Sequence, residues 1–163
     1  MIYIAHRGNI YGETPSFENH PDHINLSLTL GYNVEVDVWH NEEQFWLGHD
    51  EPLHKVEPEF LADERIWVHA KNHMALVMSL KYGFHVFWHQ DDDCTLTSKG
   101  YMWAYPGKNI EGSIAVMPEI NNDYIQNRIG ICSDIVGEYK NEILSQYFLG
   151  NPMSVGRNMN EEY

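Results

Sequence analysis

The stretch NVEVDVW, residues 33–39, decides the fold. Side chains alternate between the two faces of a strand, so Glu35 and Asp37 share one face and the three valines share the other. Valines on the covered face are typical of a parallel sheet packed under helices. Two carboxylates side by side inside a barrel repel each other and resist desolvation, and a bound cation would remove both penalties. Oxygen ligands suit Mg²⁺ or Ca²⁺. The alternative is an edge strand whose two acids are solvated.

Short apolar runs and helix-like segments alternate around this stretch. The expected strands are 2–6, 33–39, 45–48, 66–70, 84–89, 101–105, 113–117 and 130–133. The expected helices are 19–31, 73–82 and 137–148. This βαβ rhythm favours a parallel sheet with crossover helices. After residue 90 little room remains for helices between the strands.

Length and charge limit the classes of protein and partner. The chain has 163 residues, and we expect one domain over 1–150 followed by a loosely ordered C-terminal tail at 151–163. A net charge of -14 repels polyanions, so nucleic acid is not an expected partner. The N-terminus lacks the apolar segment of a secretory signal, and no apolar run reaches the roughly 20 residues of a membrane span. We therefore expect a cytoplasmic protein, and the sequence leaves the oligomeric state open.

Two histidines flank the acidic pair. His6 ends the first expected strand, and His49 ends the return of a hairpin in GHD, residues 48–50. The carboxyl ends of parallel barrel strands gather at one mouth, where active sites are built. Two histidines beside a cation can serve as general base and general acid. A single histidine at a strand end is more often structural, but two around an acidic pair form a site hypothesis.

Four motifs in order resemble the glycerophosphodiester phosphodiesterase family of the PI-PLC-like phosphodiesterase superfamily: HRG at 6–8, FEN at 17–19, VEVDV at 34–38 and GHD at 48–50. The resemblance implies an α/β fold, a shortened TIM-type (β/α) barrel with reduced or missing helices in its second half. It also implies a metal-dependent hydrolase of a small-molecule glycerophosphodiester. By this resemblance His6 and His49 are the acid/base pair, Arg7 binds phosphate, and Glu35 and Asp37 hold Mg²⁺ or Ca²⁺, with Mn²⁺ as a further candidate.

The third strand departs from the family pattern in VHAKN, residues 68–72. Lys71 matches the family's phosphate-binding lysine, whereas His69 stands where the family has an acidic metal ligand. A neutral imidazole could still bind the metal and would favour Mn²⁺, Fe²⁺ or Zn²⁺. His69 could instead brace the phosphate, with water as the third ligand. The alternative function is therefore a catalytically inactive barrel that binds a phosphorylated ligand.

Further pocket candidates follow the later strands. The aromatic ones, whose rings could stack on a head group or a cation, are Trp88, His89, Trp103 and Tyr105. More often such rings belong to the core. Glu119 could supply a missing carboxylate, with a plain surface position as the alternative. Asp134, in ICSDIVGEY, is similar to the acidic residue that ends the family's last strand.

Overall fold

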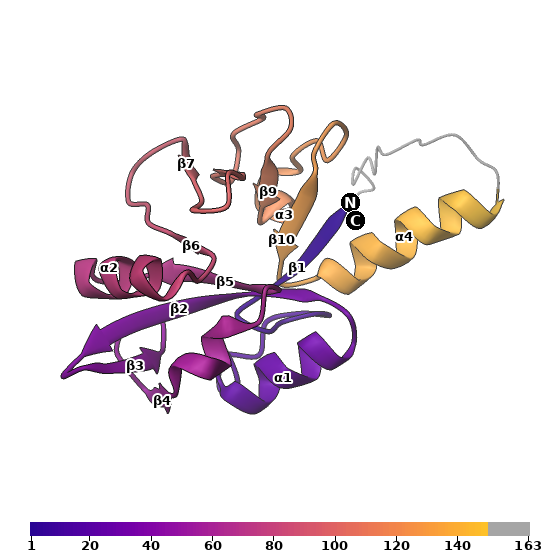
Figure 1. Ribbon diagram of the computed structural model, residues 1–163. Helices are drawn as coiled ribbons and strands as arrows, with labels where there is room; N and C mark the ends of the chain where they lie inside the picture. Colours follow the sequence, from indigo (N-terminus) through magenta and orange to yellow (C-terminus); the bar gives the residue numbers. More distant parts are fainter. Residues whose placement is uncertain (150–163) are drawn as a thin grey trace, which may run out of the picture.

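The computed structural model describes residues 1–149, so the tail expected at 151–163 lies outside the described residues. One ten-stranded mixed sheet curls into a half-barrel (Figure 1). Its strands are β1 (Ile2–His6), β2 (Asn33–Asn41), β3 (Gln44–Leu47), β4 (His54–Val56), β5 (Ile66–Ala70), β6 (Val86–Phe87), β7 (Cys94–Leu96), β8 (Met102–Ala104), β9 (Ile114–Val116) and β10 (Gly130–Ser133). The helices are α1 (Pro21–Thr29), the 3₁₀ helix η1 (Pro58–Ala62), α2 (His73–Tyr82), α3 (Pro118–Asn121) and α4 (Val136–Leu149).

The expectation of a TIM-type (β/α) barrel is wrong. The parallel strands lie in the order β6, β5, β2, β1, β10, β9 and β8, and β3, β4 and β7 add antiparallel pairs. Within the described part of the chain, β6 pairs only with β5, so the ladder does not close. The segment 105–113 that joins β8 to β9 is shorter than a helical crossover and contains Pro106, Gly107 and Gly112. The second half therefore has too little chain for the outer ring of helices.

The two faces of the sheet bury different side chains. On the outer face the valines of β2 are fully buried in a cluster that includes Ile24 of α1 and Ala75 of α2. The inner face carries a second cluster, made of Ile4, Trp67, Phe87, Trp103, Ile114 and Cys132. Glu35 is 2% exposed and Asp37 is 0% exposed. The predicted alternation is thus confirmed, and the alternative of two solvated acids is wrong.

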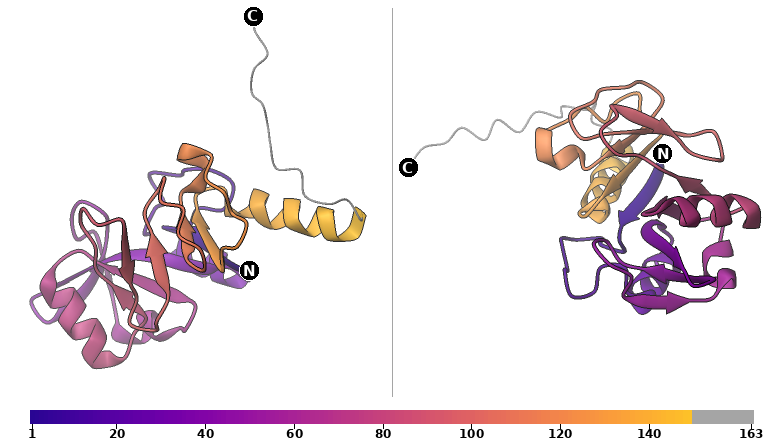
Figure 2. Two further views of the ribbon diagram at one scale, coloured as in Figure 1. Left: turned by 90° about the horizontal axis from the view of Figure 1, so that it is seen from above. Right: turned by 90° about the vertical axis from the view of Figure 1, so that its left-hand side faces the viewer.

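Helix α2 begins and ends at residues suited to those positions. The Asn72 side chain accepts a hydrogen bond from the Ala75 backbone N–H at 2.8 Å, which satisfies a donor of the first turn. Gly83 ends the helix with φ of 78°, a conformation that glycine adopts without strain. Figure 2 shows α2 packed along the sheet, while α4 extends beyond it. No helix among residues 1–149 is long and apolar enough to cross a membrane.

The turn between β2 and β3 offers a stability prediction. Asn41 pairs with Gln44, and the two turn residues Glu42 and Glu43 have φ of 49° and 62°. This two-residue turn favours Asn-Gly, because positive φ strains larger side chains. We expect the double substitution Glu42→Asn, Glu43→Gly to raise the free energy of unfolding by about 1 kcal/mol in urea titrations. An unchanged or lower free energy of unfolding would show that the turn between β2 and β3 is not strained.

His85 offers a second prediction, on pH and stability. It is 6% exposed, and its Nε2 lies 2.8 Å from Thr97 Oγ1. Burial, and then the charge of Lys99, lower the pKa of His85 from 6.5 to about 4. The unfolded chain therefore takes up a proton that the folded chain refuses, and stability falls as pH drops from about 6.5 to about 4, by up to about 3 kcal/mol. Urea titrations across this range should give a flatter profile for His85→Asn, and equal slopes would contradict the prediction.

Candidate functional site

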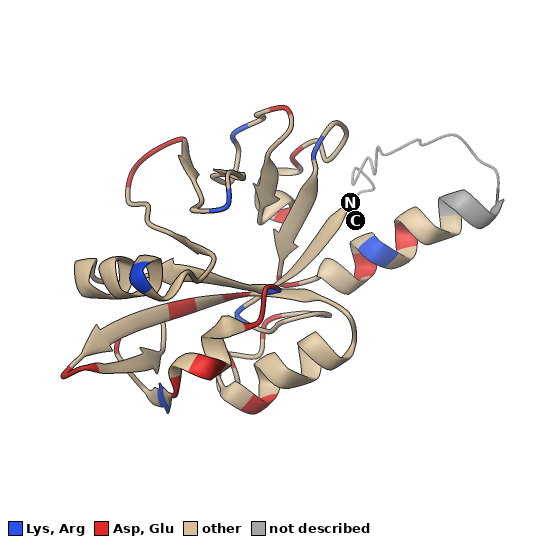
Figure 3. Ribbon diagram, in the orientation of Figure 1, with Lys and Arg blue, Asp and Glu red and all other residues tan. Residues whose placement is uncertain are grey.

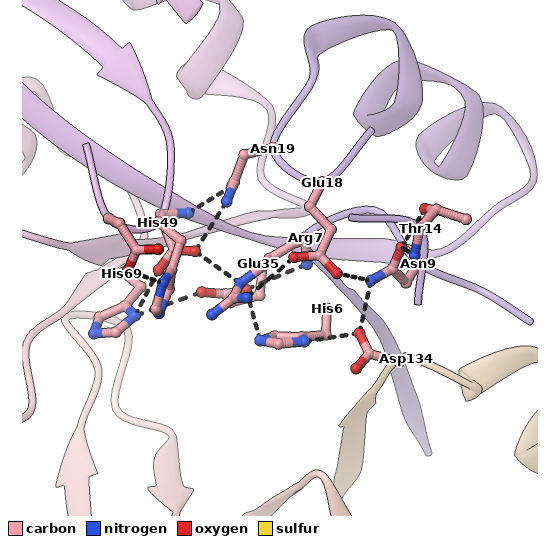
Figure 4. A network of polar contacts seen from close by, with 12 residues as sticks. His6, Arg7, Asn9, Thr14, Glu18, Asn19, Glu35, His49, His69 and Asp134 are labelled. Atoms are coloured by element: carbon pink, nitrogen blue, oxygen red, sulfur yellow. Dashed lines mark hydrogen bonds and ion pairs between the residues drawn. The ribbon is translucent and has the colours of Figure 1, made fainter. Parts of the chain in front are cut away.

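A cavity of about 180 Å³ lies at the carboxyl end of the parallel strands. Its lining residues are His6, Arg7, Glu35, His49, His69, His89, Trp103, Tyr105, Pro106 and Val116. Asp37 belongs to the same polar network through its contacts with Arg7 and His69, and Lys71 joins the network through Asp37. The segments that carry the four sequence motifs therefore converge on one place, and Figure 4 shows this network.

Asp37 lies at the centre of the network. Its Oδ2 is 2.9 Å from Arg7 Nε, and its Oδ1 is 3.1 Å from His69 Nδ1 and 3.4 Å from Lys71 Nζ. Burial alone would raise the pKa of this carboxyl, but the contact with His69 and the charges of Arg7 and Lys71 outweigh it. The pKa of Asp37 consequently lies well below its usual range, and the side chain is an anion.

His69 lies between the two carboxylates that the sequence assigned to metal binding. Its Nδ1 is 3.1 Å from Asp37 Oδ1 and 3.6 Å from Glu35 Oε1. Burial would lower the pKa of His69, yet these carboxylates raise it to about 9. The ring stacks on Phe87 and on His89, with centroids 5.1 Å and 4.7 Å away. Without a metal, the raised pKa therefore favours an imidazolium at His69, which offsets one of the two carboxylate charges.

Glu35, Asp37 and His69 fit a divalent cation. Their ligand atoms all lie within 4.8 Å of one another. Asp37 Oδ1 is buried and makes ion-pair contacts but no hydrogen bond of good geometry, so its lone pairs suit a metal ion. These three side chains offer two anionic oxygens and one imidazole nitrogen, a set that suits Mn²⁺ as well as Mg²⁺.

The candidate site contains four carboxylates and two basic side chains, so its charges balance only when two further positive charges are present. The carboxylates joined in the network are Glu18, Glu35, Asp37 and Asp134. Arg7 and Lys71 are its permanently charged cations. Protonated His6 and His69 would complete the balance, and so would one divalent ion. Acidic residues also outnumber basic ones over the rest of the described fold (Figure 3).

His6 is held by a buried acid that follows the neighbouring strand β10. Its Nδ1 donates to Asp134 Oδ1 at 2.8 Å, and its Nε2 lies 3.9 Å from Glu35 Oε2. The Asn9 amide also donates to Asp134 Oδ1 at 2.8 Å. Burial would lower the pKa of His6, but the hydrogen bond with Asp134 and the charge of Glu35 raise it overall. This bond fixes the ring, leaving Nε2 as the nitrogen directed at the acidic pair.

The FEN motif orients the site from the loop before α1. Glu18 accepts from Arg7 Nη1 at 3.1 Å and from the Asn9 amide at 3.0 Å. Asn19 donates to Asp37 Oδ2 and accepts from the Asp37 backbone N–H, each at 2.9 Å. Arg7 Nη2 makes no hydrogen bond within the described residues, so it remains available to a ligand. The motif pointed to these residues, but their roles could be read only from the structure.

His49 lies at the rim of the cavity. It follows β3, its side chain is 44% exposed, and its Nδ1 is 2.7 Å from Asp50 Oδ1. His49 lines the same cavity as His6, as the sequence predicted. The hairpin formed by β2 and β3 places it there, because the Gly48 backbone N–H donates to the Asp37 carbonyl at 3.1 Å.

The remaining pocket candidates divide into two groups. His89, Trp103 and Tyr105 line the cavity. Trp88 does not, because side chains alternate along the chain and its ring packs against the outer cluster. Glu119 is also outside the cavity lining: it accepts from Ser133 Oγ at 2.7 Å, and burial raises its pKa.

Comparison with protein-family models, curated proteins and solved structures found no match to this chain.

Proposed function

We propose that the protein is a metal-dependent phosphodiester hydrolase that acts on a glycerophosphodiester-like substrate. The observation that carries the proposal is the convergence of the Asp134-bound His6 and the metal-type group of Glu35, Asp37 and His69 on one cavity. The resemblance to the glycerophosphodiester phosphodiesterase family supports the same reaction. Phosphodiester cleavage needs charge neutralised on the phosphate and a proton delivered to the leaving oxygen.

Each part of the reaction has a residue of suitable chemistry. A divalent ion held by Glu35, Asp37 and His69 would withdraw charge from the phosphate oxygens. Arg7 Nη2 and Lys71 Nζ donate hydrogen bonds to the same oxygens.

The two histidines divide the proton transfers. One takes the proton of the attacking hydroxyl as its oxygen bonds to phosphorus, and the other gives a proton to the alkoxide as the second P–O bond breaks. One proton passes from the nucleophile to the first histidine and one from the second histidine to the leaving alkoxide, so atoms and charges balance, and the two histidines end the step with exchanged protonation states. His6 is oriented by Asp134, whereas His49 stands at the open rim.

Binding of a phosphorylated ligand without turnover is the second candidate function. It is favoured by the 3.1 Å contact between His69 and Asp37, which supplies positive charge inside the acidic pair without a metal. In that case the cavity presents His69, Arg7 and Lys71 to an anion, and the divalent ion has no role.

Turnover of a glycerophosphodiester panel in Mg²⁺, Ca²⁺, Mn²⁺ or chelator separates the two functions. We expect metal-dependent cleavage that His6→Ala and Glu35→Ala abolish. His73→Ala removes an exposed histidine at the start of α2 and should leave turnover unchanged. Absence of turnover with every metal, in folded protein that still binds inorganic phosphate, would reject the hydrolase and favour the binding protein.

A further inference from the structure

A second cavity lies at the opposite end of the parallel strands from the candidate site. Its volume is about 540 Å³, within the range of roughly 300–1,000 Å³ typical of small-molecule sites. Ile2 and Asn33, the first residues of β1 and β2, line it together with Phe84 and His85, which precede β6. It is therefore formed at the amino ends of the parallel strands, with Leu61 and Ala62 at the end of η1 as part of its lining.

Aromatic rings form one wall of this second cavity. The Trp67 ring lies 4.0 Å from the His85 ring and 5.1 Å from the Tyr101 ring, measured between centroids. Trp67 is 2% exposed, and its Nε1 donates to Asn33 Oδ1 at 3.1 Å, so the indole is fixed in place. A rigid aromatic wall with a polar neighbour suits a flat ring, which can pack without reorganising the protein.

Two side chains of the lining, Lys99 and Asn33, keep N–H groups that are not used within the described residues. Lys99 Nζ donates to the Gly83 carbonyl at 3.2 Å and keeps further N–H groups. The amide nitrogen of Asn33 makes no hydrogen bond among the described residues. Asp63 is already paired with Arg65 at 2.7 Å.

Two other titratable groups complete the lining. Glu64 is exposed at the rim. Burial and Lys99 keep His85 neutral by lowering its pKa to about 4. Among the described residues, Lys99 is consequently the one cation of the lining, and it has no carboxylate partner.

We propose that the second cavity binds a small planar aromatic carboxylate. Its ring packs against Tyr101 and the edge of Trp67, and its carboxylate accepts hydrogen bonds from Lys99 and the Asn33 amide. An acidic chain repels anions in general, so binding requires this combination of stacking and one local cation. Because the exposed carboxylate of Glu64 also lies at the rim, a preference for the carboxylate over a cationic aromatic compound of the same size is the specific consequence of contact with Lys99.

Calorimetric titration of the whole chain with 1-naphthoate tests the proposal. We expect one equivalent to bind, and Lys99→Ala to weaken binding by about tenfold, as for loss of a charge-assisted hydrogen bond. Ala62→Trp places a bulky ring on an exposed position of the lining and should abolish binding without removing a core side chain. Lys108→Ala, whose ammonium pairs with Asp93 elsewhere, is the matched control and should bind as the wild type does.

Three outcomes would overturn the proposal. The first is no binding of 1-naphthoate by folded wild-type protein. The second is equal affinity for 1-naphthylmethylamine, which would show that Lys99 does not select the charge. The third is binding that inorganic phosphate displaces and that Lys99→Ala and Ala62→Trp leave intact, which would place the ligand in the candidate hydrolase site.

Discussion

Replacing His6 by alanine is expected to lower kcat/KM for phosphodiester cleavage by a factor of about 10²–10⁴, the usual contribution of a general acid or base. His6 is the histidine whose ring is fixed by a buried carboxylate and whose other nitrogen is directed at the metal-type group. Initial rates over a range of substrate concentrations measure the loss. His73→Ala serves as the matched control, and full activity in His6→Ala would remove His6 from the mechanism.

Asp134→Asn tests how His6 is positioned. Asp134 does not reach the cavity lining, so its role is to orient His6 and to hold the pKa of that histidine up. We expect the asparagine variant to lose activity and to shift the His6-dependent limb of the pH–rate profile to lower pH. A purely structural role would lower the amount of folded enzyme without moving the profile.

The local features of the fold could be predicted from the sequence. The alternation in NVEVDVW placed Glu35 and Asp37 opposite the valines, since the period of a strand is a property of the backbone. The helix 73–82 was predicted at its observed bounds, because Gly83 is a strong signal for a helix end, and the structure adds Asn72 as its N-cap. The strands 2–6, 66–70 and 130–133 were confirmed in the same way.

The global shape could not be predicted, because it depends on contacts between distant segments. The strand expected at 84–89 shrinks to Val86–Phe87, and β4, β7 and α3 were not expected. Their few residues carry no periodicity long enough to recognise. Closure of a sheet also depends on how its last strands meet, which no local pattern records, so the barrel prediction failed.

In the candidate site too, local features could be predicted from the sequence, whereas contacts between distant segments could not. Motif spacing placed His6, His49 and the metal-type residues at one mouth, because parallel strands end together. The hydrogen bond from His6 to Asp134 depends on β1 lying between β2 and β10, two strands far apart in sequence. A weak similarity was the only signal for Asp134, and the register turned it into a specific contact.

Substitution of His69 by glutamate is expected to make stability depend on divalent metal. At neutral pH the wild-type imidazolium lies 3.1 Å and 3.6 Å from the carboxylates of Asp37 and Glu35. Glutamate removes that cation and adds a third buried anion. In chelator we therefore expect the free energy of unfolding to fall by about 3 kcal/mol, the cost of leaving buried charge uncompensated.

Added Mg²⁺ should restore the stability of His69→Glu, because three carboxylates form a stronger site for a hard cation than two carboxylates and an imidazole. At a concentration about 100 times its dissociation constant, the ion would return about 2.7 kcal/mol. His69→Gln separates the two effects, since it removes the cation without adding an anion and should show a smaller response to Mg²⁺. Urea titrations with and without Mg²⁺ measure all three proteins.

If His69→Glu were as stable as the wild type in chelator, or did not respond to Mg²⁺, then Glu35, Asp37 and residue 69 would not form a shared cation site. A stabilisation by Mg²⁺ that grows with the negative charge at residue 69 would instead support the shared site. It would show that this one position determines whether an imidazolium or a divalent ion offsets the charges of Glu35 and Asp37.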